Sequence, residues 1–216
     1  VYSLSLQSDG LWAGTSFGIW RNAQGDWSQP EWSSMFHRPN AVMSIATDLS
    51  GDRWIGSQRG LWHQKGTKIP EPVRTGGLEI PRAINSLLME PDGALWVPIA
   101  GAGLGYLHAD WRQAVRFHSE GDGLGGAMYR AIGRARDGGA WLGGMNGVVE
   151  HLAIDGTTQL LGPDALARLQ DTRSSSIVED DAGRIWLGHR RGLIRVGNDG
   201  AVDEWGSEDP DAPVPS

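Results

Sequence analysis

The stretch SIATDLSGDRWIG, residues 44–56, and the stretch SIVEDDAGRIWLG, residues 176–188, share one pattern. In each, a Ser stands ten residues before a Trp, and Gly residues stand three before it and two after it. With small variations the pattern recurs around five tryptophans, which are Trp12, Trp54, Trp96, Trp141 and Trp186. Their spacings are 42, 42, 45 and 45 residues. Self-similarity at such a period indicates an array of structural repeats.

Each repeat contains short apolar segments separated by turn residues. In the second repeat, residues 41–46 are apolar, residues 48–52 supply a turn, and residues 53–56 form the second short strand. A glycine hairpin at residues 56–60 leads into a third apolar segment, and a variable stretch supplies a fourth. Four antiparallel strands every 42–45 residues are typical of a β-propeller blade.

We therefore predict an all-β fold, a β-propeller built from five four-stranded blades. The units are about 1–40, 41–82, 83–127, 128–172 and 173–205, and residues 206–216 form an acidic, proline-containing tail. Only residues 165–170 favour a short helix. The five units either close a ring or form part of a larger one. The five repeat tryptophans are expected at equivalent, largely buried sites on the second strands.

Composition and charge exclude several classes of protein. Cysteine is absent, which excludes disulfides, thiolate metal sites and a cysteine nucleophile. The net charge of −7 argues against a nucleic-acid partner. No window holds the 18 or so apolar residues that a membrane-spanning helix needs. The chain opens at Val1 without an initiator Met, so we expect a mature or excised piece of a longer protein.

The repeats resemble a known family. Ser44, Asp48, Gly51, Trp54 and Gly56, with the matching residues of the fifth repeat, are similar to the two-component regulator propeller repeat. The resemblance covers about residues 1–205. It implies an extracytoplasmic sensor region of a bacterial signalling protein, coupled to flanking sensor and output domains. Members usually carry seven blades and a β-sandwich, and five units depart from that pattern.

Three other motifs have a structural interpretation. Residues 14–18, GTSFG, match the hydrolase nucleophile elbow, which requires a strand-to-helix turn and here falls in a strand–turn–strand context. The glycine-rich stretches 101–105 and 121–126 lack the following helix that a phosphate-binding loop needs. Asp48 and Asp180 are expected to cap their own turns.

No cofactor or metal is expected from the sequence. The six histidines form no i, i+4 pair on a helix and no H-x-H pair on a strand, so a zinc motif is absent. A streptogramin-lyase-like propeller would need a His and a Glu facing each other across the central region. His37 and His189 are the histidine candidates for that alternative, and neither lies in a matching motif.

Loops that precede the first strand of four repeats each contain an Arg. In a propeller such loops feed the strand nearest the axis, so their polar side chains would gather at one mouth. The candidate ligand-binding residues are His37, Arg38, Asn40, Arg82, Asn85, Tyr129, Arg130 and Arg173. Arginine forks suit an anionic or polyhydroxy ligand, and the Tyr129 ring would offer a stacking surface. The alternative, solvated loop arginines without a ligand, stays open.

These observations favour a non-catalytic ligand-sensing propeller of a bacterial receptor in the periplasm. Its expected partners are a small-molecule or oligosaccharide ligand and flanking domains of a parent receptor. A carbohydrate-binding or adaptor propeller is the first alternative, and a lyase is the second. No strand is left over at either end of the repeats to complete a shared blade. We therefore also predict an incomplete or weakly closed assembly that can self-associate.

Overall fold

The computed structural model describes residues 1–75, 78–108, 115–119, 121, 123–126, 128–162, 167, 173–189 and 192–206. The helix expected at 165–170 lies outside these residues except for residue 167, and so do residues 207–216 of the expected tail. Among the described residues, no helix is long and apolar enough to cross a membrane.

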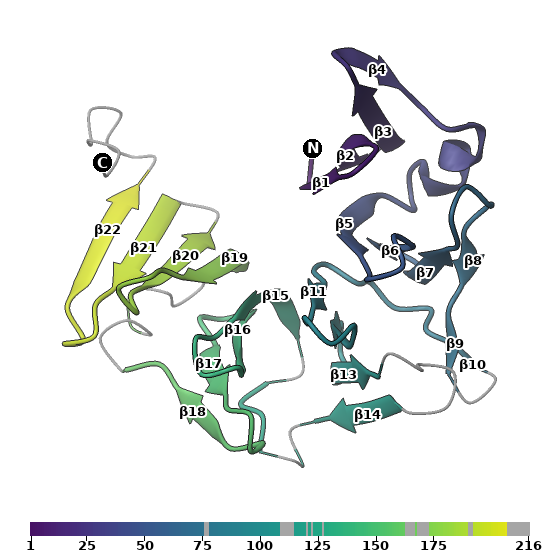
Figure 1. The fold of residues 1–216 in the computed structure, drawn as a ribbon. Helices are drawn as coiled ribbons and strands as arrows, with labels where there is room; N and C mark the ends of the chain where they lie inside the picture. The colour runs from purple at the N-terminus through teal and green to yellow at the C-terminus, as the bar shows by residue number, and fades with distance from the viewer. Residues whose placement is uncertain are drawn as a thin grey trace. The chain divides into compact units, whose positions relative to one another are not determined.

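Five four-stranded antiparallel sheets follow one another along the chain, each with its strands in sequence order (Figure 1). Blade 1 consists of β1 (Ser3–Gln7), β2 (Gly10–Thr15), β3 (Gly18–Ala23) and β4 (Asp26–Ser28). Blade 2 consists of β5 (Val42–Thr47), β6 (Arg53–Ser57), β7 (Gly60–Gln64) and β8 (Glu71–Pro72). Blade 3 consists of β11 (Leu88–Met89), β12 (Leu95–Ile99), β13 (Gly103–Leu107) and β14 (Val115–His118).

The last two blades repeat this plan. Blade 4 consists of β15 (Tyr129–Arg134), β16 (Ala140–Gly144), β17 (Val149–Leu152) and β18 (Thr158–Leu160). Blade 5 consists of β19 (Ser174–Glu179), β20 (Ile185–His189), β21 (Gly192–Val196) and β22 (Val202–Gly206). The 3-10 helix η1 (Glu31–Phe36) joins blades 1 and 2, and β9 (Arg74–Thr75) with β10 (Leu78–Glu79) forms a hairpin before blade 3. The predicted five blades of four strands are confirmed.

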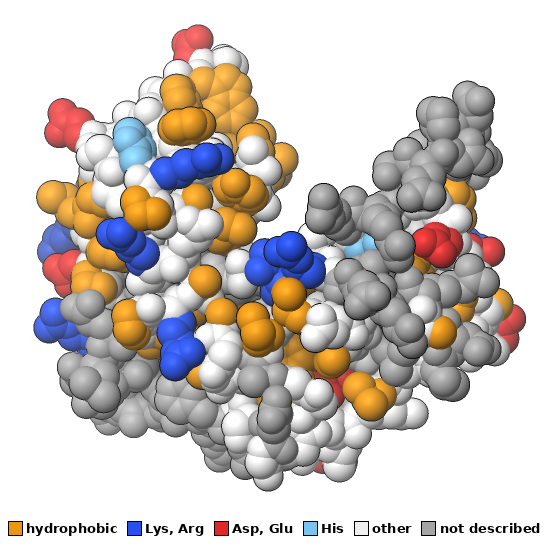
Figure 2. Space-filling view, turned by 180° about the vertical axis from the view of Figure 1, so that it is seen from behind, with side chains coloured by type: hydrophobic (Ala, Val, Ile, Leu, Met, Phe, Trp, Pro, Cys, Tyr) orange, Lys and Arg blue, Asp and Glu red, His pale blue; other side chains and the backbone are white. Residues whose placement is uncertain are grey.

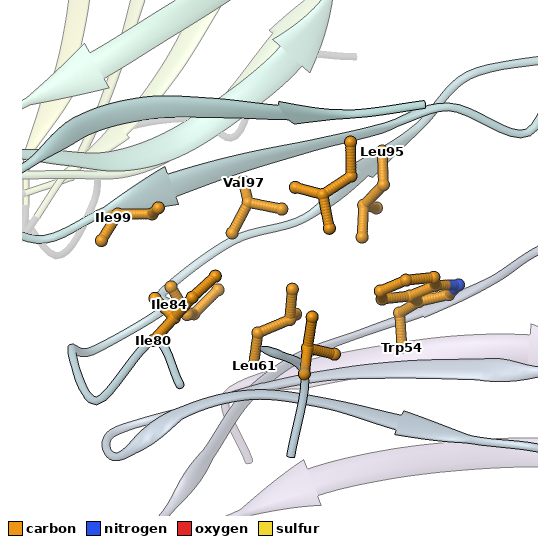
Figure 3. Close-up of a cluster of buried hydrophobic side chains, with 9 residues drawn as sticks. Trp54, Leu61, Ile80, Ile84, Leu95, Val97 and Ile99 are labelled. Carbon is orange, nitrogen blue, oxygen red and sulfur yellow. The ribbon is translucent and has the colours of Figure 1, made fainter. Parts of the chain in front are cut away.

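The chain divides into two compact units, residues 1–117 and 118–216. Unit 1 holds blades 1 to 3 except for His118, the last residue of β14, and unit 2 holds blades 4 and 5. Each unit has buried clusters where consecutive blades meet. Trp54 and Leu61 of blade 2 face Leu95 and Val97 of blade 3 in one of them (Figure 3). Within each unit, sequence-adjacent blades thus bury their apolar faces against one another.

The five repeat tryptophans occupy the same place on the second strand of each blade, as predicted. Trp12 and Trp54 are buried, and each residue is 4% exposed. Trp96, Trp141 and Trp186 are only partly buried, so the expectation of burial holds fully for two of the five. The indole N–H donates to a carboxylate both in the buried Trp12 and Trp54 and in the partly buried Trp141 and Trp186, so this bond does not set the degree of burial.

A side chain on the third strand lies directly opposite each of these tryptophans. These partners are Arg21, His63, Tyr106, His151 and Arg195. The rings of His63 and Trp54 have centroids 4.5 Å apart, and the Arg195 guanidinium lies 5.5 Å from the centroid of Trp186. Aromatic and cationic groups both bind the face of an indole ring favourably. The opposite position therefore selects such residues.

Glycine two residues after the tryptophan lets the next blade approach. A Cβ on Gly56 would lie 2.9 Å from Cγ2 of Ile84, which leads into blade 3. A Cβ on Gly143 of blade 4 would lie 2.6 Å from Cβ of Ser174 in blade 5. Real Cβ atoms do not come that close, so this glycine of the repeat is required by packing between blades.

Arg53 fastens blade 1 to blade 2. Its residue is 7% exposed, and Nη2 donates to Oδ2 of Asp9 at 2.6 Å while Nε donates to Oε1 of Gln7 at 2.7 Å. The guanidinium also lies 3.9 Å from the ring centroid of Trp12. Although burial raises the pKa of Asp9, the Trp12 indole and the Arg53 guanidinium together lower that pKa below its usual value. The pair is thus held in its charged form.

Candidate functional site

Arg130 and Arg173 lie near the starts of two consecutive blades in unit 2, two positions apart in the aligned repeats. Arg130 is the second residue of β15, the first strand of blade 4. Arg173 stands directly before β19, the first strand of blade 5, and is held there by an antiparallel bridge to Met145. Arg173 thus precedes its strand, whereas Arg130 lies on β15 itself and not in the loop before it, where the sequence pattern had placed it.

The two arginines line one open pocket of about 310 Å³. Its other lining residues are Ser174 and Ser175 of blade 5. Ser174 is buried, with 1% of the residue exposed, and its Oγ has no hydrogen-bond partner among the described residues. A buried hydroxyl normally finds a partner, so this group indicates that a polar ligand atom or a water belongs nearby.

The electrostatics of the pocket favour an anion. Burial, and then the positive charge of Arg173, lower the pKa of the Arg130 guanidinium. Within the part of the chain that the structure describes, neither guanidinium takes part in a hydrogen bond or an ion pair. Two guanidinium groups that are partly removed from water raise the free energy of the folded state when no carboxylate among the described residues lies beside them. A carboxylate, phosphate or sulfate would satisfy both forks at once.

On the face drawn in Figure 2, Lys and Arg side chains occur at several separate places among hydrophobic and other groups. With a net charge of −7, attraction of an anion must come from a local pair.

Tyr129 lies next to Arg130 but faces the interior. The residue is 1% exposed, and its hydroxyl donates to Oε1 of Glu150 and accepts from the N–H of Gly126 at 3.2 Å. Its ring is therefore not accessible for stacking on a ligand, contrary to the expectation from sequence. The side chain points inward because the buried carboxylate of Glu150 needs a donor. Burial raises the pKa of Glu150, even though the Gly125 N–H donates to it.

The candidates from blade 1 lie at the end of η1 in unit 1. His37 is exposed and bridges Phe17, and the Arg38 guanidinium lies 5.8 Å from the ring centroid of Phe17. Asn40 is 5% exposed, and its amide donates to the carbonyl of Met35 and accepts from the Arg59 N–H. Asn40 thus fastens the loop and presents no polar atom to solvent.

The two candidates before blade 3, Arg82 and Asn85, do not line the pocket of Arg130 and Arg173. Arg82 is exposed, and its Nη1 donates to the carbonyl of Ala100 at 3.2 Å. Asn85 is partly buried. Of the eight predicted residues, Arg130 and Arg173 are the two that the structure shows lining a common pocket. Ser174 and Ser175 were not singled out from sequence, because adjacent serines carry no signal of their own.

The motifs with structural interpretations occur in hairpins. Thr15 pairs with Gly18 in the β2–β3 hairpin, so the GTSFG stretch contains no nucleophile elbow. Ile99 pairs with Gly103 in the β12–β13 hairpin, which accounts for the first glycine-rich stretch. Residue 122 of the second stretch lies outside the described residues. Asp48 and Asp180 cap their turns through Oδ1, as expected.

Comparison with known families and structures agrees with this architecture. Residues 168–191 match the family model described as "Two component regulator propeller". The predicted resemblance is thereby confirmed at the fifth repeat, which contains both Arg173 and Ser174. A comparison with curated proteins found no match.

Solved structures share the fold at low sequence identity. The extracellular domain of the hybrid two component system BT3049 from B. thetaiotaomicron superimposes with a TM-score of 0.74 at 17% identity, over 98% of this chain and 29% of that one. The corresponding domain of BT4673 from B. thetaiotaomicron gives 0.71 at 16% identity, over 95% and 30%. The chain therefore spans about 30% of the length of these sensor domains.

Enzymes with a propeller fold also match. Virginiamycin B lyase from Staphylococcus aureus, in an inactive variant with quinupristin, gives a TM-score of 0.71 at 15% identity, over 98% of this chain and 71% of that one. At such identities the likeness establishes the fold. The chain is thus a propeller that resembles extracellular sensor domains of two-component systems and shares its fold with lyases.

Proposed function

We propose that this chain is a non-catalytic ligand-sensing propeller of a bacterial signal-transduction receptor. It would act on the extracytoplasmic, periplasmic side and pass its response to flanking domains of a parent receptor. The proposal is supported by the repeat match at residues 168–191 and by the fold shared with extracellular sensor domains.

The Arg130–Arg173 pocket carries the ligand-binding part of this proposal. Two guanidinium groups without a counter-charge, beside a buried serine hydroxyl, suit a small ligand with a carboxylate, phosphate or sulfate group. Arg38, Arg82, His37 and Asn85 remain proposed as wider contributors. Asn40 and Tyr129 are left out, because both are buried and hydrogen-bonded within the protein.

Calorimetric titration with inorganic phosphate and with sulfate tests the pocket. We expect binding to the unaltered chain, weaker at higher ionic strength because salt screens exposed charges. The double variant Arg130→Ala/Arg173→Ala should lose it. The matched control Arg59→Ala/Arg136→Ala also removes two positive charges, but at exposed positions outside the pocket. It should bind phosphate as the unaltered chain does. Equal binding by the pocket variant and the control would contradict the proposal.

A third variant, Arg82→Ala, tests the wider set of residues. Weakened phosphate binding in a folded Arg82→Ala protein would show that Arg82 in unit 1 also contributes to phosphate binding. Unchanged binding would assign the phosphate to the arginine pair alone.

Two alternatives are distinguished by other probes. A carbohydrate-binding propeller would bind a neutral sugar such as glucose, which lacks the anionic group that the arginine pair requires. A lyase would convert quinupristin, the compound bound to the lyase variant. We expect no product by mass spectrometry.

A further inference from the structure

Two aspartates and a histidine converge in blade 2, far along the chain from the arginine pocket. Asp48 and Asp52 border the turn between β5 and β6, and His63 lies on β7. Nε2 of His63 is 3.8 Å from Oδ2 of Asp48 and 3.8 Å from Oδ2 of Asp52. One ligand-type atom of each residue lies within 4.8 Å of the other two.

Hydrogen bonds fix both carboxylates so that one oxygen of each faces the histidine. Oδ1 of Asp48 accepts from the N–H groups of Ser50 at 2.9 Å and Asp52 at 3.0 Å. Oδ1 of Asp52 accepts from the N–H of Gly66 at 2.7 Å. The Oδ2 atoms are the ones turned toward His63. Such outer hydrogen bonds orient the ligands of metal sites in general.

The Trp54 ring fixes the imidazole. Its centroid is 4.5 Å from that of His63, and its Nε1 donates to Oδ2 of Asp48 at 3.2 Å. The side chains of Asp48, Asp52 and His63 are 18%, 15% and 15% exposed. Two carboxylates that approach each other with so little exposure repel unless a cation lies between them.

The separations fit a metal ion better than a direct contact. At 3.8 Å the histidine nitrogen is too far from either carboxylate oxygen for a hydrogen bond. Zinc ligands stand about 2.0–2.2 Å from the ion, so two ligands in tetrahedral geometry are roughly 3.3–3.6 Å apart, and the 3.8 Å separations found here exceed this by a few tenths of an ångström.

Blade 4 provides an internal comparison. His151 occupies the place of His63, opposite Trp141, and its Nε2 lies 3.2 Å from Oδ1 of Asp137. That distance is an ordinary hydrogen bond with one aspartate. Blade 2 instead has two carboxylates at equal, longer distances from the ring nitrogen.

We propose that Asp48, Asp52 and His63 bind a divalent transition-metal ion of the Zn²⁺ type. One imidazole nitrogen and two carboxylate oxygens form a donor set that such ions accept. Ca²⁺ and Mg²⁺ prefer oxygen ligands alone. Water would complete the coordination. The ion would tie the β5–β6 turn to β7, and the site is independent of the proposed anion pocket.

Calorimetry with ZnSO₄ on the full chain tests the site, with MgCl₂ and CaCl₂ as comparisons. We expect Zn²⁺ to bind with one equivalent and Mg²⁺ and Ca²⁺ to bind far more weakly. Asp52→Asn and His63→Gln should each weaken Zn²⁺ binding by at least about tenfold. The control His151→Gln changes the matching residue of blade 4 and should bind Zn²⁺ unchanged.

A second measurement guards against misfolded variants. Zn²⁺ should raise the melting temperature of the unaltered chain and of His151→Gln, because a ligand that binds the folded state stabilises it. The same rise should be absent in Asp52→Asn, which keeps an oxygen to accept the Gly66 N–H. Absence of Zn²⁺ binding to the unaltered chain would overturn the proposal. So would full binding by both variants, or Ca²⁺ binding as tight as that of Zn²⁺.

Discussion

The indole Nε1 of Trp141 in blade 4 donates to Oε2 of Glu179 in blade 5, across 2.9 Å. In blades 2 and 5 the corresponding tryptophan donates to an aspartate six residues earlier in its own blade, Asp48 or Asp180. Blade 4 has Ala135 at that place. Glu179 replaces the missing carboxylate from the next blade and also accepts the N–H of Arg136 at 3.0 Å. The hydrogen bond that closes a turn in other blades thus joins two blades here.

Glu179→Ala should therefore destabilise unit 2. The change leaves the Trp141 indole and the Arg136 amide without their acceptor, which costs about 1–3 kcal/mol. Urea denaturation followed by circular dichroism measures the loss. The control Asp181→Ala removes an exposed carboxylate two residues away and should change stability by less than about 0.5 kcal/mol. Equal stability of the two variants would show that Glu179 does not join the blades.

Gly56→Ala tests the close approach of blades 2 and 3. The new methyl group would meet Oγ of Ser44 at 2.4 Å and Cγ2 of Ile84 at 2.9 Å, and the backbone oxygen of Ile84 at 3.0 Å. Overpacking of this kind costs about 1–3 kcal/mol. Gly162→Ala is the matched control, because no atom lies within 4 Å of a Cβ there. A neutral Gly56→Ala in thermal melts would contradict the packing role assigned to this glycine.

Ionisation of Glu150 should lower the free energy of unfolding as pH rises. Its pKa in the folded state is raised, so the folded state binds more protons than the unfolded state between the ordinary carboxyl pKa and the raised value. Stability from the protonated form is complete below the unfolded pKa and is lost as pH rises through the folded pKa. Glu150→Gln cannot ionise and should not lose this contribution.

Denaturation of both proteins between pH 4 and pH 7 measures the difference, with about pH 4.5 as the lower edge of the window. The unaltered protein should lose stability relative to Glu150→Gln as pH rises. A constant difference across the range would mean that the two states bind protons at Glu150 equally.

Blade 1 presents an apolar strand that should support self-association. Leu4 is 63% exposed, whereas Ile45 and Ile177, at the same place in blades 2 and 5, are 9% and 3% exposed. Exposed apolar strands of this kind invite partners. Light scattering should show an apparent mass that rises with concentration, and Leu4→Ser should reduce the rise. A constant monomer mass at all concentrations, together with high stability, would contradict the predicted incomplete or weakly closed assembly of blades.

The architecture could be predicted because the residues that recur in the repeat are ones that the packing of the blades requires. The residues of Trp54 and Gly56 recur because each unit places an indole on its second strand, and because the glycine leaves space for the next blade at Gly56 and Gly143. The period of 42–45 residues then indicated the number of blades. The partial exposure of Trp186 could not be predicted, because the repeat gives it the same motif residues as the buried Trp54.

The sites were less predictable for a related reason. Arg130 and Arg173 both lie near the start of a first strand, and the repeat made that neighbourhood predictable, although the two differ by two positions in the aligned repeats. Tyr129, the first residue of β15, points inward toward Glu150, 21 residues later in the chain, so its direction depended on a contact that spacing does not reveal. The cluster around His63 likewise joins a turn to a third strand, and no local metal motif marks it.

Nuclear magnetic resonance of the arginine Nε–H groups tests the central claim most directly. Inorganic phosphate is added to ¹⁵N-labelled protein, and each arginine is assigned by its Lys variant. The account predicts saturable shifts of the Arg130 and Arg173 signals, with Arg59 and Arg136 unchanged. Absence of shifts at Arg130 and Arg173, or equal shifts at all exposed arginines, would contradict a ligand pocket between the first strands of blades 4 and 5.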